Sequence, residues 1–295
     1  MIEGGGLGKF DPKEIGPSDI QKNNGVIDYV AENEKEATII AKKILSYFQG
    51  DIKDWKADDQ TQLSNIMPKD RRWSYPVRDI IKIISDIEEF TEIKPEYGKG
   101  IVTCFIRIEG KPFGLLANDS QHLGGAIDSE GADKASSFIE ICSEYGLPII
   151  SLVDTPGFMV GPDSEKEGAV RRMSNLFKIG SKVKVPLTAI FLRKGYGLGA
   201  QAMVGGSLHE PVYTAAWPTG EFGAMGLEGA VKLGFKKELE KIEDNSKKEE
   251  LFNSLVEKLY DKGKAIEAAA HLEIDAVINP SETRSVILKS QKAFV

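Results

Sequence analysis

The amino-acid sequence predicts an α/β fold in which most neighbouring strands run parallel. From residue 100 onward, short apolar runs typical of buried strands alternate with longer segments whose apolar residues recur at helical spacing. Glycine-containing turns follow three of the expected strands. In folds of this class, ligands bind where strands end and helices begin, so these turns form the candidate functional region.

Ahead of this region the sequence predicts loops and helices. Residues 1–25 are rich in Gly, Pro and Asn and show no clear periodicity. Residues 31–48 carry apolar side chains at helical spacing, and a shorter helix is expected over 76–90. The polar stretch between the two helices contains two prolines, which favours a loop.

The first two expected strands form a hairpin. The segments "GIVTCFIRIEG" (100–110) and "PFGLLAND" (112–119) are largely apolar, and the sequence Glu-Gly-Lys at 109–111 predicts the turn between them. The following helix is expected to take Ser129 as its N-cap and to end at Gly146.

The next segments continue the alternation of strands and helices. Buried strands are predicted at "LPIISLVD" (147–154), "VPLTAIFLR" (185–193) and "PVYTAAWP" (211–218). Helices are expected over 165–182 and around 199–206. The apolar side of the first of these helices would consist of Val170, Met173, Phe177 and Ile179.

The C-terminal region, residues 236–271, is predicted to be helical and is highly charged. One apolar stripe runs along it, formed by Phe252, Leu255, Val256, Leu259 and Tyr260. Such a stripe either covers a core or meets a partner subunit.

Composition excludes several classes of protein. The 295 residues include 38 Lys and Arg against 45 Asp and Glu, a net charge of −7, which argues against a nucleic-acid surface. The two cysteines and three histidines show no metal-binding spacing, so we expect no metal site. No signal peptide and no membrane-spanning apolar run is apparent, and a reduced cytoplasmic compartment is expected.

Three glycine-containing turns carry the functional signal. They are "HLGGAID" (122–128), "DTPGFMVGPDSE" (154–165) and "GYGLGAQAM" (195–203), and each follows an expected strand. At one edge of a parallel sheet, their unpaired backbone N–H groups would form an oxyanion hole, which stabilises negative charge developing on a carbonyl oxygen. The alternative for any single turn is that it is only a tight connection.

Two other motifs match only in part. Gly195-x-Gly197-x-x-Ala200 fits the loose dinucleotide form GxGxxA, but the next strand ends in "AAWPTGE", where the acidic ribose ligand is a poor match. The DxxG of "LVDTPGF" occurs in GTPases, yet the chain has no GxxxxGK[ST] phosphate loop. No GxSxG elbow is present either. The chemistry therefore points to backbone amides rather than to an acid–base side chain.

Taken together, residues 115–180 ("LLANDSQHLGGAID…"), 185–207 ("VPLTAIFLRKGYGLGAQAMVGGS") and 215–231 ("AAWPTGEFGAMGLEGAV") resemble the carboxyltransferase subunit of biotin-dependent acyl-CoA carboxylases. The resemblance is to the C-terminal half of the propionyl-CoA carboxylase β-chain type. It implies a crotonase-like fold, a spiral of strand-strand-helix units. The whole chain, 1–295, would be one C-terminal carboxyltransferase domain. Its parts would be an extended lead-in segment (1–25), a peripheral helical part (26–99), a crotonase-like core (100–235) and C-terminal helices (236–295).

The resemblance also implies an activity and partners. The family moves a carboxyl group from carboxybiotin to the α-carbon of an acyl-CoA, which here would be acetyl-, propionyl- or a longer acyl-CoA. Biotin is carried on a separate carboxyl carrier domain. The implied partners are an N-terminal carboxyltransferase domain, the biotin carboxyl carrier protein, the biotin carboxylase subunit and further copies in a dimer or hexamer.

The resemblance assigns roles to particular residues. The backbone N–H groups of Leu198 and Gly199 would form the hole for the biotin ureido oxygen. The other residues expected at the same pocket are Gly124, Gly125, Ala126, Phe158, Gly197 and Gln201. Some short-chain members have Asp where this chain has Gln201, so the acyl preference stays open.

Two alternatives to a carboxylase subunit remain. The family's N-terminal domain, which holds most of the acyl-CoA site, has no counterpart in these residues, so the chain is expected to be a fragment or one half of a split enzyme. A related enzyme is the biotin-dependent carboxyl-CoA decarboxylase, which works within a membrane complex. A different alternative is a non-catalytic assembly module whose glycine turns are structural relics.

Overall fold

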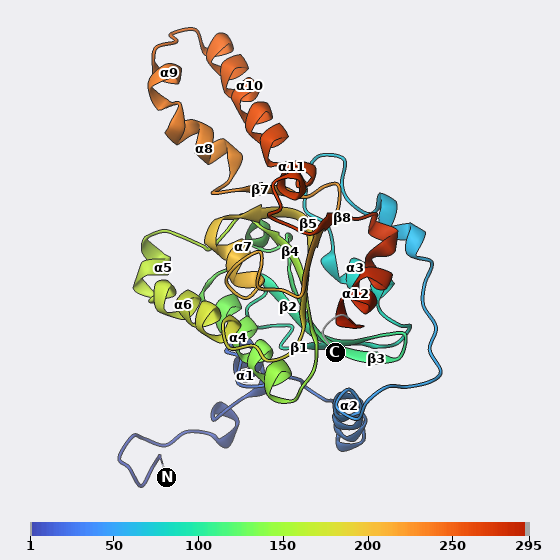
Figure 1. Ribbon diagram of the computed structural model, residues 1–295. Helices are drawn as coiled ribbons and strands as arrows, with labels where there is room; N and C mark the ends of the chain where they lie inside the picture. The colour runs from blue at the N-terminus through green and yellow to red at the C-terminus, as the bar shows by residue number, and fades with distance from the viewer. Residues whose placement is uncertain (1, 293–295) are drawn as a thin grey trace.

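The computed structural model describes residues 2–292, and in this part of the chain one eight-stranded sheet forms the centre of the fold (Figure 1). The strand order is β1-β2-β3-β4-β5-β6-β8, and β7 pairs with the end of β5. The strands are β1 (Phe90–Ile93), β2 (Ile101–Ile108), β3 (Lys111–Asn118), β4 (Ile149–Thr155), β5 (Leu187–Tyr196), β6 (Tyr213–Ala216), β7 (Glu221–Gly223) and β8 (Ala276–Val277).

The type of strand pairing changes once across the sheet, at β3. β1, β2 and β3 pair antiparallel, whereas the pairs from β3 through β4, β5 and β6 to β8 are parallel. Glu109 and Gly110 alone connect β2 to β3, with φ of 51° and 76°. Two successive positive φ values are typical of the type I′ turn that fits the twist of a hairpin. The predicted hairpin and the largely parallel sheet are confirmed.

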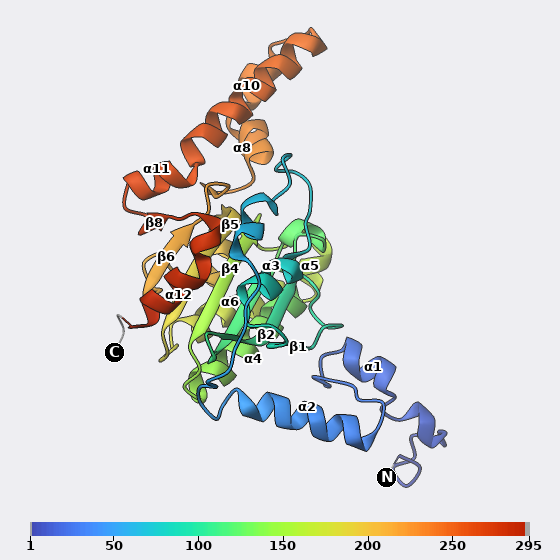
Figure 2. The same cartoon turned by 90° about the vertical axis from the view of Figure 1, so that its right-hand side faces the viewer.

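Helices cover both faces of the sheet (Figures 1 and 2). They are α1 (Ser18–Asn23), α2 (Glu34–Ser46), α3 (Val77–Ile84), α4 (Ser129–Glu144), α5 (Pro162–Lys166), α6 (Ala169–Gly180), α7 (Gly197–Met203), α8 (Leu227–Gly234), α9 (Lys236–Glu240), α10 (Asn245–Gly263), α11 (Ala265–Ala270) and α12 (Thr283–Lys292). One apolar core lies between the sheet and α4, α6 and α7. A second core lies between the opposite face and α3 and α12. Since both faces are covered, β2 and β4 are buried along their whole length.

Two helix boundaries differ from the prediction. Asp128, not Ser129, caps α4: its Oδ1 accepts a hydrogen bond of 2.7 Å from the Gly131 N–H. The helix predicted over 165–182 is two helices, α5 and α6, separated at Gly168, whose φ of 68° breaks the helical backbone. Val170 then points outward and is 64 % exposed, so it does not belong to the apolar side of the helix.

The sheet also uses segments outside the predicted core range of 100–235. The helix expected over 76–90 ends at Ile84, and the chain continues into the edge strand β1. At the other end of the chain, β8 pairs with β6, and α12 then packs on the second core. The strands β1 and β8 were not predicted, because strands of four and two residues leave no readable periodicity.

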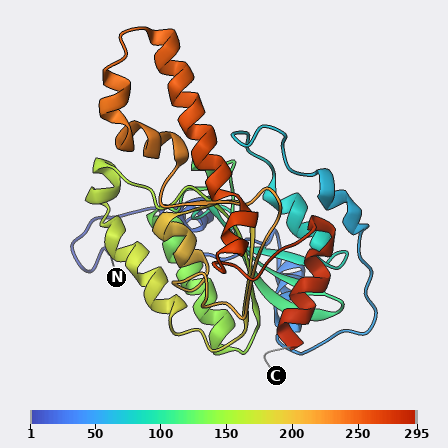
Figure 3. The same ribbon diagram turned by 45° about the horizontal axis from the view of Figure 1, so that its top comes forward.

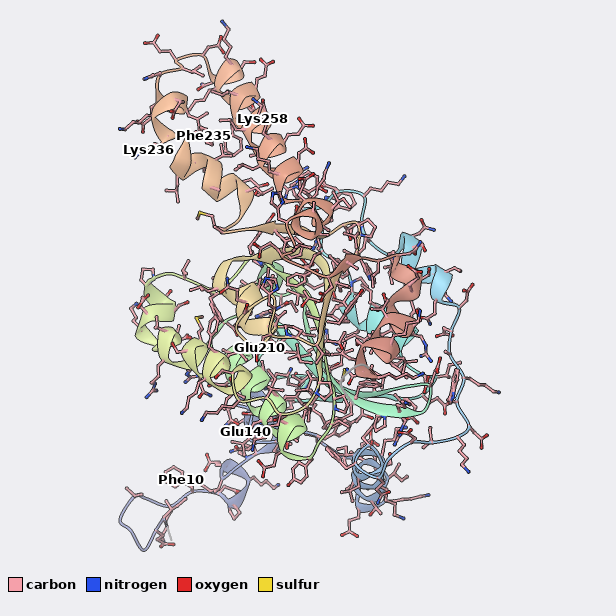
Figure 4. All side chains as sticks on the ribbon, viewed as in Figure 1. Phe10, Glu140, Glu210, Phe235, Lys236 and Lys258 are labelled. Atoms are coloured by element: carbon pink, nitrogen blue, oxygen red, sulfur yellow. The ribbon has the colours of Figure 1, made fainter. Side chains whose placement is uncertain are left out.

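A helical arm of α8, α9 and α10 projects from one end of the sheet, while α1 and α2 lie toward the opposite end (Figures 1, 2 and 3). The predicted apolar stripe lies on α10 and is half-buried. It packs in part against α8, where the Lys232 ammonium lies 5.9 Å from the ring centre of Phe252. Figure 4 places Phe235 where α8 meets α9, with Lys258 on α10. The stripe therefore holds the arm together.

Candidate oxyanion site

The three glycine-containing turns meet at one edge of the sheet. They follow β3, β4 and β5, which are neighbouring parallel strands. The Ile127 N–H donates to the Gly157 carbonyl over 3.0 Å, and the Met159 N–H donates to the Ile127 carbonyl over 2.8 Å. Gly199 packs closely against the second turn, since a Cβ at position 199 would lie 2.7 Å from the Gly157 Cα. The predicted convergence of the three turns is confirmed.

The first turn of α7 presents free backbone donors. No side chain caps α7, and within residues 2–292 the N–H groups of Leu198 and Gly199 donate to no side chain and to no loop carbonyl. Leu198 is 63 % exposed and Gly199 is buried beside the second turn. Amides at the start of a helix carry partial positive charge that favours an anionic oxygen. This pair of amides is the geometry that an oxyanion hole requires.

The turn after β3 has an unusual backbone. Leu123, Gly124 and Gly125 have φ of 48°, 65° and 90°, so three successive residues lie in the left-handed region. The Gly124 carbonyl accepts a hydrogen bond of 2.8 Å from the Lys194 Nζ. A left-handed residue with a side chain, such as Leu123, carries strain that the surroundings must offset.

Replacing each glycine of this turn by alanine is expected to have different effects. At Gly125 a Cβ would lie 2.3 Å from the Asp154 carbonyl oxygen, whereas at Gly124 no atom lies within 4 Å. Gly124→Ala should lower the free energy of unfolding by about 1–2 kcal/mol, the strain of a left-handed residue. Gly125→Ala should cost about 1–3 kcal/mol more, because it also overpacks the turn. Urea unfolding of both variants measures the difference, and equal losses would contradict this geometry.

A cavity of about 540 Å³ adjoins α7, within the size range of small-molecule sites. Gly197 and Gln201, two of the predicted pocket residues, line it from α7. Four further lining residues come from β7, α10 and α11, or directly follow α11: Phe222, Lys262, Glu267 and His271. Of the described residues, no three His, Cys, Asp or Glu side chains form a group that could hold a metal ion.

The other predicted residues do not line this cavity. Gly124, Gly125 and Ala126 lie in the turn after β3, bonded to the turn after β4 through Ile127. The Phe158 ring packs against Phe177 of α6, with ring centres 6.1 Å apart, and so faces the first core. The predicted residues therefore fall into two groups on either side of the α7 amides.

A buried ion pair lies next to the turns, where β4 and β5 end. Asp154, at the end of β4, is fully buried and accepts hydrogen bonds from the Arg193 Nη2 at 2.9 Å and the Lys194 backbone N–H at 3.0 Å. Arg193 also donates to the carbonyls of Arg71 and Trp73, at 2.8 and 2.6 Å. The two charged residues are visible in the sequence, but no local pattern predicts that Asp154 and Arg193 pair across 39 residues.

A second buried carboxyl lies next to this pair. Glu221 on β7 is 1 % exposed and lies opposite Lys194 in the strand register. Burial raises the pKa of Glu221, and the Arg71 guanidinium, 3.5 Å away, opposes that rise. Burial likewise raises the pKa of the neighbouring Tyr196 hydroxyl. Asp154, Arg193 and Glu221 are thus charged groups that water reaches poorly.

The fold and the site define the class of this protein: an α/β protein that offers backbone amides at the carboxyl edge of a covered sheet. The family model described as carboxyl transferase domain matches residues 11–295. The chain belongs to this family, and the predicted crotonase-like carboxyltransferase fold is confirmed.

Several relatives and solved structures are similar to the chain. The methylmalonyl-CoA carboxyltransferase 12S subunit of Propionibacterium freudenreichii subsp. shermanii is 33 % identical, over 92 % of this chain and 53 % of the relative. The biotin-dependent long chain acyl-coenzyme A carboxylase beta4 subunit of Mycobacterium tuberculosis is 31 % identical, over 94 % of this chain and 55 % of the relative. The chain thus spans about half the length of these curated relatives.

Among solved structures, a single-chain, multi-domain long-chain acyl-CoA carboxylase superposes with a TM-score of 0.91 and 50 % identity, over 98 % of this chain and 29 % of that one. The transcarboxylase 12S hexamer, with methylmalonyl-CoA and methylmalonic acid bound, gives a TM-score of 0.87 and 29 % identity. That match covers 99 % of this chain and 57 % of the other.

Proposed function

We propose that this chain is the biotin-side, C-terminal half of an acyl-CoA carboxyltransferase. It would transfer a carboxyl group from carboxybiotin to the α-carbon of an acyl-CoA of acetyl, propionyl or longer chain length. The observation that carries the proposal is the pair of first-turn amides at Leu198 and Gly199, whose neighbours Gly197 and Gln201 line a cavity of about 540 Å³. Membership of the carboxyl transferase family supports it.

The residues present fit a biotin ureido group, because two adjacent N–H donors match a single carbonyl oxygen and the cavity gives room beside them. When bound, carboxybiotin supplies the carboxyl group, and its ring nitrogen can take the α-proton after the carboxyl leaves. The amides of Leu198 and Gly199 hold the oxygen on which negative charge develops. Gly197 and Gln201 shape the adjoining cavity wall, and Gln201 contributes to the acyl preference.

The second half of the active site would come from elsewhere. In this proposal an N-terminal carboxyltransferase domain supplies the hole for the thioester oxygen and most of the acyl-CoA site. The chain spans about half of its curated relatives, which supports this division. The turns at Gly124, Gly125, Ala126 and Phe158 would support the biotin side. A biotin carboxyl carrier protein, a biotin carboxylase subunit and further copies, in a dimer or hexamer, would complete the enzyme.

The test is the reverse half-reaction, carboxylation of free biotin from malonyl-CoA or methylmalonyl-CoA. We expect activity only when an N-terminal carboxyltransferase domain is added to the chain, because each domain then supplies one oxyanion hole. Activity of the chain alone would contradict the division of the site. No activity from a mixture shown to associate would favour the assembly module.

A second candidate is the decarboxylase direction of the same chemistry. It is favoured by one relative, the methylmalonyl-CoA decarboxylase subunit alpha of Veillonella parvula, which is 30 % identical over 90 % of this chain. No helix in the described residues is long and apolar enough to cross a membrane. Purification of the native complex would separate the two candidates, because a carboxylase co-purifies with a biotin carboxylase and the decarboxylase with membrane subunits. A cytoplasmic location belongs to the carboxylase proposal and is supported by two buried free thiols.

A further inference from the structure

We propose that Lys194 is a positioning residue for carboxyl transfer: its ammonium fixes the turn after β3. The expected effect on carboxyl transfer rests on the proposed function. The contact of Lys194 with the turn does not depend on it. It concerns a residue that neither the glycine motifs nor the α7 amides identify.

The contacts of Lys194 join strands that are far apart in the sequence. Its Nζ donates to the Gly124 carbonyl over 2.8 Å, across 70 residues, and lies 4.0 Å from the Asp154 Oδ1. The side chain is 17 % exposed, so the ammonium is held between the turns rather than in bulk water. A side chain on β5 thereby holds the turn that follows β3.

The hydrogen-bond partner of the Lys194 ammonium is the Gly124 carbonyl rather than a carboxylate. The Asp154 carboxylate is already paired with Arg193, whose Nε and Nη2 both donate to it. At 4.0 Å from the Asp154 Oδ1, the Lys194 Nζ directs its hydrogen bond to the turn after β3. An ammonium has three N–H donors, and the Gly124 carbonyl takes one of them.

The turn that Lys194 holds needs such support. Its left-handed run includes Leu123, which lacks the conformational freedom of glycine. Within the turn, Gly125 and Ala126 donate to the carbonyls of His122 and Leu123, at 2.9 and 3.2 Å. If the Lys194 bond is lost, these two hydrogen bonds should open more often and their amide hydrogens should exchange faster.

The protonation of Lys194 gives the proposal a pH dependence. Burial lowers the pKa of Lys194, and the nearby Asp154 opposes that effect. Other charged groups facing it are Arg193, Glu221 and Arg71, and the turn that it holds carries His122, paired with Asp128 at 3.7 Å. The ammonium is lost as the pH rises through this lowered pKa. The transfer rate should therefore fall at alkaline pH, whereas arginine at the same position would stay charged.

The first measurement is hydrogen–deuterium exchange of the chain by itself. Lys194→Met should speed exchange in residues 122–128, and Lys194→Arg should change it little. The matched control is Lys178→Met, which removes an exposed lysine of α6. Unchanged exchange in Lys194→Met would overturn the proposal, whether or not the wild-type chain shows any transfer activity.

The second measurement is the pH profile of biotin carboxylation with the N-terminal domain added. Lys194→Met should lower kcat by on the order of 10²-fold at neutral pH, because a misplacement of about 1 Å near the reacting groups can cost that much in rate. Lys194→Arg should retain activity and extend it to higher pH than the wild type. The role of the charge would be refuted by either of two results. One is an unchanged kcat in Lys194→Met, and the other is the same fall in kcat at alkaline pH for the wild type and Lys194→Arg. If the wild-type chain shows no carboxylation, that result counts against the proposed function. Hydrogen–deuterium exchange would then still test whether Lys194 holds the turn.

Discussion

Leu198→Pro is expected to lower the rate of carboxyl transfer by about 10²–10³-fold, because proline removes one of the two backbone donors of the proposed hole. Leu198 lies in the first turn of α7, where proline fits the helix and removes no intrahelical hydrogen bond. The fold should therefore remain intact. The measurement is kcat for biotin carboxylation by the chain with the N-terminal domain added.

The matched control is Leu198→Ala. It removes a side chain that is 63 % exposed and keeps the N–H group. We expect the rate of this variant to stay close to that of the wild type. Equal rates for Leu198→Pro and Leu198→Ala would exclude the amide of Leu198 as an oxyanion donor and would favour an assembly role for the chain.

Asp154→Ala is expected to lower the free energy of unfolding by about 3–5 kcal/mol, because it leaves the buried Arg193 without its carboxylate. Both partners are almost inaccessible, with exposed side-chain fractions of 0 % and 3 %. Arg193 also anchors the loop at Arg71 and Trp73, so the loss should extend to that loop. The midpoint of urea unfolding measures the effect.

The control for this loss is an ion pair on the surface. Asp163 pairs with Lys166 at 2.9 Å, but their side chains are 93 % and 77 % exposed. Asp163→Ala should change the free energy of unfolding by less than about 1 kcal/mol. If Asp154→Ala were as mild as Asp163→Ala, the ion pair below the turns would not be what supports them.

The candidate site could be predicted in part. The three turns were found in the sequence because their glycines stand directly after apolar strands, and parallel strands bring such turns to one edge. The cavity beside α7 could not be found in this way, because Lys262 and His271 reach it from distant parts of the chain. The contact of Lys194 with Gly124 and the pairing of Asp154 with Arg193 carried no local signal either.

What the sequence alone determined is the run of strands and helices from β2 to β6 and the position of the amide-rich turns. These features are local, since burial on two faces produces continuous apolar runs and left-handed turns favour glycine. Only the tertiary structure decided the edge strands β1 and β8, the break at Gly168 and the charged support below the turns. The free energy of those contacts depends on which residues come within a few ångströms of one another, and their separation along the chain does not determine that distance.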